Sequence, residues 1–231
     1  MRRKCLFLFT LGMVVGVSAR PASEHVAAKV MDPMEKLDLK VQQRVAIHEA
    51  GHAVATGVLN VKRPPTSLHI LVEHRRSSGG LGLTMMPGPE TIFTSGEIFD
   101  LVVELMASMA SEAIIMGDVS IGSGNDLAQA NNLLVQACGL KGMCGQLIVE
   151  NGGPDLKKMV SEHLLTAYHR ASALIRANTG LVHDLADLAM AQPIVKGERV
   201  LNAEQLKAFF ASHPVVAVPP ESRQIAPIVK E

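Results

Sequence analysis

Residues 44–53 read Arg-Val-Ala-Ile-His-Glu-Ala-Gly-His-Ala, and their centre, His48-Glu49-Ala50-Gly51-His52, is an H-E-x-x-H motif. Apolar residues recur around the motif at helical spacing from Val41 to Val58, which predicts a helix of about five turns that ends before Pro64. Because residues four positions apart lie on the same face of a helix, both imidazoles can bind one metal ion. The stretch therefore predicts a helix that carries a zinc site.

Glu49 lies between the two histidines and gives the motif its chemistry. Zinc lowers the pKa of a bound water to about 7, and a neighbouring carboxylate can take the water's proton without binding the metal. The alternative is that the two histidines only fill a helix core, but a buried unpaired Glu among Ala and Val residues would be costly. We therefore predict Zn²⁺ at His48 and His52, with Glu49 as the catalytic base.

A third protein ligand is required, because catalytic zinc sites use three protein ligands and keep the fourth position for water. The candidates are Glu112, Asp118, Asp126 and several histidines. Spacing alone does not choose among these candidates.

The rest of the pattern is mostly helical. Two segments, Ser67–Glu73 and Gly80–Met86, have strand patterns and flank a turn region at Arg75–Gly79, which predicts a hairpin or two strands of a small sheet. Thr94 and Glu97 form a T-x-x-E capping box. Helical spacing predicts further helices over residues 94–117, 125–138, 154–178, 181–190 and 202–210. The fold class expected is mainly α with a small β-sheet (α+β).

Length and composition predict one domain with extensions. The 231 residues, 48% of them hydrophobic, suit a single core, which we place at residues 38–211. The segment 212–231 contains four prolines and is predicted to be a flexible C-terminal tail.

Residues 1–19 have the pattern of a signal peptide: three basic residues, an apolar run, and a small-x-small site at Val17-Ser18-Ala19. We expect export to a secretory compartment if this segment is cleaved, and membrane association if it stays as an anchor. The apolar run is shorter than the roughly 20 residues of a spanning helix, which favours cleavage. A mis-assigned start and a remnant of a longer membrane protein are the other readings of this segment.

Charge argues against a nucleic-acid partner. Lys plus Arg equals Asp plus Glu at 22 each, and the chain has one Tyr and no Trp on which bases could stack. No nucleic acid is expected as a partner.

Cys138 and Cys144 form a pair that an oxidising compartment could join in a disulfide. Their C-x5-C spacing is not a usual zinc spacing. We favour the interpretation that they are two small buried residues of the core.

Several segments together resemble the peptidase domain of the FtsH family, the M41 class of membrane-bound, ATP-dependent proteases. They are the stretch around the H-E-x-x-H motif, Leu81-Gly82-Leu83-Thr84, Ala110-Ser111-Glu112, Ser123-Gly124-Asn125-Asp126-Leu127, and Tyr168 with Ala171. The resemblance covers about residues 40 to 210 in order.

This resemblance implies the remaining site residues. The family's third zinc ligand is the aspartate of the Asn-Asp-Leu element, which corresponds to Asp126, and a glutamate that corresponds to Glu112 lies near the family's site. The family lays an extended substrate along the strand that corresponds to Gly80–Met85, which fits strand addition.

Two departures from the family pattern limit what the resemblance implies. No G-x-x-x-x-G-K-[ST] loop occurs in the sequence, so the family's ATPase module is missing and the chain should not bind ATP by itself. Ser108-Met109 replaces the family's usual Gly-Arg pair, which puts the family's ring assembly in doubt.

The function expected is that of a zinc-dependent metalloendopeptidase acting on unfolded or flexible polypeptides. Its possible partners are a separate ATPase or further copies of the same chain. The rival hypothesis is a non-catalytic pseudopeptidase or adaptor that keeps the fold and binds polypeptides or an ATPase partner.

Overall fold

The computed structural model describes residues 34–59, 65–74, 80–85, 94–144 and 154–218. The N-terminal segment 1–19, the turn at 75–79 and the tail from residue 219 onward, all subjects of sequence predictions, lie outside these ranges. Among the described residues, no helix combines the length and apolar character needed to cross a membrane.

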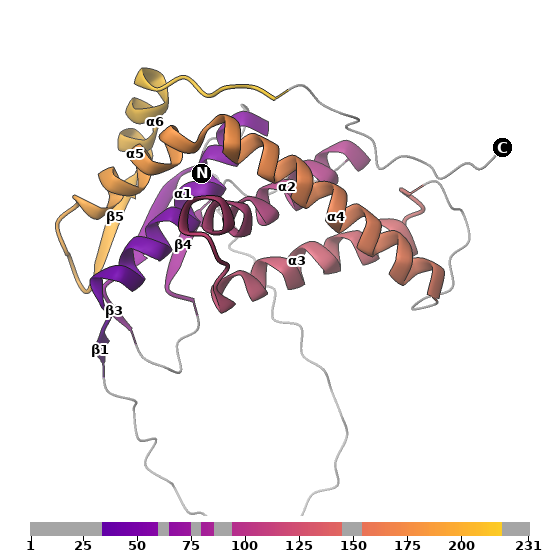
Figure 1. The fold of residues 1–231 in the computed structure, drawn as a ribbon, viewed down its shortest axis with the longest axis horizontal. Helices are drawn as coiled ribbons and strands as arrows, with labels where there is room; N and C mark the ends of the chain where they lie inside the picture. Colours follow the sequence, from indigo (N-terminus) through magenta and orange to yellow (C-terminus); the bar gives the residue numbers. More distant parts are fainter. Residues whose placement is uncertain (1–33, 60–64, 75–79, 86–93, 145–153, 219–231) are drawn as a thin grey trace, which may run out of the picture. The chain divides into compact units, whose positions relative to one another are not determined.

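The described chain is mainly helical with two small antiparallel sheets, so the predicted fold class is confirmed (Figure 1). In chain order the elements are β1 (Glu35–Lys36), α1 (Leu39–Leu59), β2 (Ser67–Leu71), β3 (Glu73–His74), β4 (Gly82–Met85), α2 (Ser95–Ser111), the π-helical turn η2 (Glu112–Met116), the 3₁₀ turn η3 (Ile121–Ser123), α3 (Gly124–Leu134), the π-helical turn η4 (Val135–Leu140), α4 (Pro154–Ala177), α5 (Thr179–Met190), β5 (Glu198–Asn202) and α6 (Ala203–Ser212).

Helix α1, which carries the H-E-x-x-H motif, lies at the centre of the fold and contacts α2, α5 and the sheet strands β2 and β4. The residues from Gly51 to Thr56 are all buried, which explains why small side chains dominate this helix. A Cβ on Gly51 would collide with Ser111 Oγ and lie 2.9 Å from the Ala107 carbonyl oxygen. The glycine of the motif therefore lets α1 and α2 approach closely.

Helix α2 begins where its sequence predicts, and the helical run that continues it ends at the predicted Gly117. Thr94 Oγ1 accepts a hydrogen bond from the Glu97 amide, and the Glu97 carboxylate accepts one from the Thr94 amide, which confirms the capping box. After Ser111 the helix widens into the π-helical turn η2, which ends at Gly117 with a left-handed φ of 80°. A single π-helical turn is uncommon in proteins and is often found at functional sites.

The predicted hairpin strands pair, and a third strand joins them. β2 lies antiparallel to β4, with Leu68 opposite Thr84, and antiparallel to β5, with Leu68 opposite Leu201. The order is β4-β2-β5, so β4 forms one edge. The sequence pattern did not predict β5, because this five-residue strand has only one fully buried residue, Leu201. A separate two-stranded sheet pairs β1 with β3.

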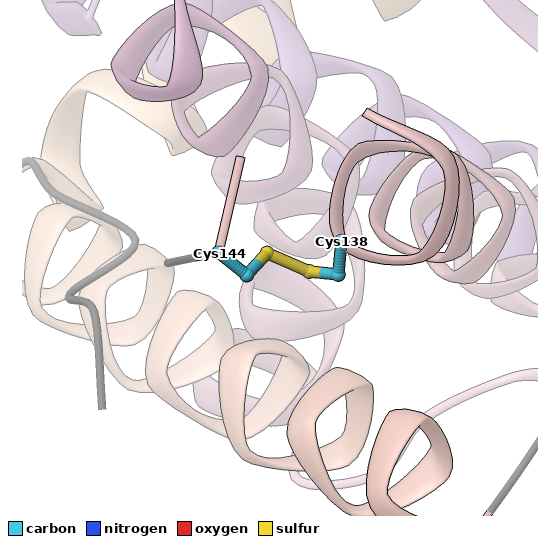
Figure 2. The surroundings of a disulfide bond; sticks show 2 residues. All are labelled: Cys138 and Cys144. Atoms are coloured by element: carbon cyan, nitrogen blue, oxygen red, sulfur yellow. A yellow bond between two sulfur atoms is a disulfide. The ribbon is translucent and has the colours of Figure 1, made fainter. Parts of the chain in front are cut away.

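The interpretation of the two cysteines needs correction. Cys138 and Cys144 are buried as predicted, but they form a disulfide with their Cα atoms 4.8 Å apart. The bond joins η4 to the turn that follows it (Figure 2). Val216, in the segment predicted as a flexible tail, exchanges two backbone hydrogen bonds, of 2.8 and 3.0 Å, with the side chain of Asn178.

Candidate metal centre

Three side chains predicted as zinc ligands come together at the junction of α1 and α3. Asp126 Oδ2 lies 3.1 Å from His48 Nε2 and 3.5 Å from His52 Nε2. One ligand atom from each residue lies within 4.8 Å of those of the other two. The two imidazoles share one face of α1, and Asp126 belongs to the first turn of α3, close to the helix start that the sequence predicted. Two nitrogens and one oxygen are ligand atoms that zinc accepts.

The Nδ1 atom of each histidine has a hydrogen-bond partner, which fixes the orientation of both rings. His52 Nδ1 lies 3.0 Å from the carbonyl oxygen of Glu104, and this oxygen can only accept, so Nδ1 carries the hydrogen. His48 Nδ1 lies 2.8 Å from Glu112 Oε1. In a neutral ring the Nε2 lone pair then points toward Asp126, as a metal ligand requires.

Glu112 is fully buried behind His48 at the start of the π-helical turn. Its carboxylate also accepts hydrogen bonds from Arg44 Nη1 (2.9 Å), the Ser120 amide (2.8 Å), the Ser120 hydroxyl (2.9 Å) and the Ser123 hydroxyl (3.3 Å). Burial works to raise the pKa of Glu112, but hydrogen bonds from His48, Arg44 and Ser120 outweigh it and lower the pKa to about 2. Glu112 is therefore a permanent carboxylate that orients His48.

The ring of His48 carries a proton at neutral pH. Burial works to lower the pKa of His48, yet hydrogen bonds with Asp126 and Glu112 raise this pKa to about 9. The pKa of Asp126 lies well below its usual range, because hydrogen bonds with both histidines outweigh the opposing effect of burial. A site that keeps one positive charge between two carboxylates at neutral pH has the electrostatics of a cation site.

Glu49 lies beside His48 on α1 and contacts β4. Its side chain is buried, and Thr84 Oγ1 lies 2.9 Å from both Glu49 Oε2 and the Glu49 carbonyl oxygen. A Cβ on Gly82 would lie 2.5 Å from Glu49 Oε1 and 2.6 Å from Val45 Cγ1. The edge strand thus approaches the motif helix only because residue 82 is glycine, and Thr84 holds the carboxylate in place.

Of the other candidates for a third ligand, Asp118 and Glu112 do not face the Nε2 atoms. Asp118 pairs with Arg44 at 2.6 Å through a side chain that is 70% exposed. Glu112 contacts His48 on the opposite ring nitrogen, which agrees with the position near the site that the resemblance implied.

Sequence reasoning missed three contacts at the centre. The Glu104 carbonyl and the Thr84 hydroxyl contact site residues, and Ser108 Oγ donates a 3.2 Å hydrogen bond to Asp126 Oδ2. In the sequence, Ser108 is distinguished only as a departure from the family pattern. A main-chain carbonyl leaves no signature in a sequence, and a threonine in a strand looks like any other strand residue.

Comparison with known proteins gives consistent matches. The sequence model described as "Peptidase family M41" matches residues 35–153, a range that contains all four predicted site residues. The protein named "ATP-dependent zinc metalloprotease FtsH 2" from Sphaerobacter thermophilus is 30% identical over 135 residues, which are 57% of this chain and 20% of the relative. A relative named "ATP-dependent zinc metalloprotease FtsH" from Syntrophobacter fumaroxidans is 25% identical over 223 residues, covering 83% of this chain and 34% of the relative. A protein of the same name from Pseudomonas putida is 34% identical over 134 residues, covering 56% and 21%. The chain spans about a third or less of the length of these relatives.

Proposed function

The chain belongs to peptidase family M41, and we propose that it is a zinc-dependent metalloendopeptidase that hydrolyses peptide bonds in unfolded or flexible polypeptides. The observation that carries the proposal is the convergence of His48 Nε2, His52 Nε2 and Asp126 Oδ2 beside a buried carboxylate, Glu49. Because both Nδ1 atoms already have partners, the ring nitrogens that remain are those that face the shared centre.

Zinc is the ion that fits these residues. His48, His52 and Asp126 would hold it, and no thiolate takes part. Bound there, zinc would supply Lewis acidity, polarising the scissile carbonyl and lowering the pKa of a water ligand to about 7.

The chain's own residues would then position and move the proton. Glu49 takes the proton from the attacking water and later gives it to the nitrogen of the leaving amine. Thr84 holds Glu49 Oε2 at 2.9 Å, so the carboxylate keeps one orientation through both transfers. Glu112 and the Glu104 carbonyl prevent rotation of the two imidazoles, and Ser108 does the same for Asp126.

The edge strand β4 would bind the substrate. Gly82 and Thr84 contact the motif helix, whereas Leu83 and Met85 expose 52% and 47% of their surface. An extended polypeptide can add to this edge through main-chain hydrogen bonds, and it could do so only where the substrate is unfolded. The relatives' names describe them as ATP-dependent, so unfolding of stable substrates would come from a separate ATPase or from an assembly with other chains.

The test uses the purified full chain, its metal content, and degradation of unfolded casein with and without a chelator. Glu49→Gln should keep stoichiometric zinc and lose hydrolysis, because the ligands remain and the proton acceptor is gone. The matched control is Glu204→Gln on the exposed first turn of α6, which should retain wild-type activity. Wild-type protein that holds zinc but cleaves no unfolded substrate would favour the adaptor hypothesis instead.

A further inference from the structure

A second group of potential metal ligands shares no residue with the first and has no part in the proposed hydrolysis. Cys138, Cys144 and His163 each offer one ligand atom, and these atoms all lie within 4.8 Å of one another. The three residues are only 0%, 1% and 8% exposed. Two sulfurs and one imidazole therefore meet inside the core.

Three different segments supply the three residues. Cys138 lies in the π-helical turn η4, a type of turn that is rare and frequent at functional sites. Cys144 follows in a turn held by a 2.9 Å hydrogen bond from the Met143 amide to the Ala137 carbonyl. His163 comes from α4, which contacts η4. Figure 2 shows the disulfide that joins the two cysteines.

His163 is an unusual residue for its position. The buried face of α4 is otherwise apolar over this part of the helix: Leu156, Met159, Val160, Ala167 and Ala171. Within the described part of the chain, the buried Nε2 of His163 has no hydrogen-bond partner, and leaving such a group unpaired costs about 1–3 kcal/mol. Burial lowers the pKa of His163, although Glu162 opposes the shift, so the ring is neutral and its lone pair is available.

We propose that Cys138, Cys144 and His163 form a redox-gated zinc site, which is closed while the cysteines are joined as a disulfide and binds Zn²⁺ once they are reduced. This proposal does not rest on the proposed peptidase function.

The change from disulfide to zinc site takes place in two steps, reduction of the disulfide and then binding of zinc. A dithiol reductant gives two electrons and two protons to the Cys138–Cys144 bond, so that the S–S bond breaks, two thiols form, and the dithiol becomes a disulfide. Zinc binding then forms two Zn–S bonds and releases both thiol protons to solvent, while neutral His163 donates its lone pair without losing a proton.

The ligand set selects the ion. Thiolate and imidazole ligands suit Zn²⁺, whereas Mg²⁺ and Ca²⁺ need oxygen ligands, and the group contains none. With Zn–S distances of about 2.3 Å, the sulfurs must separate beyond their disulfide contact, so the two states exclude each other. Three protein ligands leave one position for water.

The probe is Co²⁺, added to the full chain purified with its cysteines either reduced by a phosphine or oxidised. Thiolate ligands give cobalt a near-ultraviolet charge-transfer band that nitrogen and oxygen ligands do not, so the His48–His52–Asp126 centre is silent in this readout. Reduced protein should show the band and lose it on adding Zn²⁺, and oxidised protein should show none. Alkylation and mass spectrometry verify the thiol state. Absence of the band from reduced, folded wild-type protein would overturn the proposal.

Variants test the role of each ligand. Cys138→Ser should abolish the band. His163→Ala should weaken cobalt binding by more than about tenfold, because removing a ligand should cost more than removing a residue that only hydrogen-bonds a ligand, which costs roughly tenfold. His169→Ala, an exposed histidine on the same helix, is the matched control and should bind as wild type does. Circular dichroism checks that each variant is folded, and His163→Gln replaces His163→Ala if the latter does not fold. Unchanged cobalt affinity in a folded His163 variant would contradict a site that includes this histidine.

Discussion

Replacing Glu112 by Gln keeps the shape of the side chain but removes its charge from the network behind His48. Glu112 Oε1 accepts from His48 Nδ1 at 2.8 Å, and Oε2 accepts from Arg44 and the Ser120 amide at 2.9 and 2.8 Å. A glutamine amide group must occupy one of these two positions, and it is a donor. At Oε2 it meets two donors that cannot accept, and at Oε1 it favours the His48 tautomer that carries hydrogen on Nε2.

Either arrangement weakens the metal site, because His48 Nε2 must present a lone pair. Loss of such a partner typically lowers metal affinity about 10- to 100-fold, which corresponds to roughly 1.4–2.7 kcal/mol. The upper part of this range is expected here, since Glu112 is fully buried and water cannot replace the lost acceptor.

The assay is a competition titration of zinc between the protein and a chelator of known affinity. The matched control is Asp118→Asn, which removes the other carboxylate partner of Arg44 from a side chain that is 70% exposed. An exposed pair contributes about 0–1 kcal/mol, so this variant should bind zinc within about fivefold of wild type. Equal losses in the two variants, or Glu112→Gln affinity within about threefold of wild type, would refute the orienting role of Glu112.

Three further predictions follow from the same centre. Gly82→Ala should lower peptidase activity at least about tenfold with zinc retained, because its Cβ would lie 2.5 Å from Glu49 Oε1. The control Gly80→Ala should be active, because the nearest atom to its Cβ would be 3.6 Å away. Equal activity of the two variants would contradict this prediction. Because the pKa of His48 is raised from 6.5 to about 9, its protonation stabilises the metal-free fold below pH 6.5 and this contribution is lost as the pH rises toward 9. Zinc needs the neutral ring, so chelation should lower the melting temperature more at about pH 8.5 than at about pH 6, and the opposite order in calorimetry would argue against His48 as a ligand. ATP should leave degradation by the pure chain unchanged, since the sequence has no phosphate-binding loop. The chain should cleave a destabilised form of a model substrate domain and leave the stable form intact. ATP-stimulated cleavage of the stable form would disprove this prediction.

The pairing of the two cysteines was not predictable from their spacing in the sequence. Sequence reasoning favoured two unpaired core cysteines, yet Cys138 and Cys144 are bonded. The predicted burial of both residues is confirmed. Pairing depends on how closely η4 approaches the turn after it, and the spacing of the two residues along the chain does not fix that distance.

Local interactions made much of the fold predictable from sequence. The motif helix, the capping box at Thr94 and the β2–β4 hairpin depend on residues a few positions apart or on adjacent strands, so periodicity and cap residues identified them. The short strand β5 escaped, since its pairing with β2 is made across more than a hundred residues of chain and its own pattern is weak.

The sequence by itself determined the two imidazoles and the carboxylate of the motif, because one helical turn fixes their spacing. A family resemblance was needed to single out Asp126 from the other acidic residues. Only the tertiary structure revealed which residues hold these groups. Thr84 contacts Glu49, Glu112 contacts His48 and the Glu104 carbonyl contacts His52, and these partners are 35, 64 and 52 positions apart in the sequence. Such contacts form when α2, the turn η2 and β4 pack against α1. A carbonyl belongs to every residue and a buried threonine looks like any strand residue, so these partners carry no local signal.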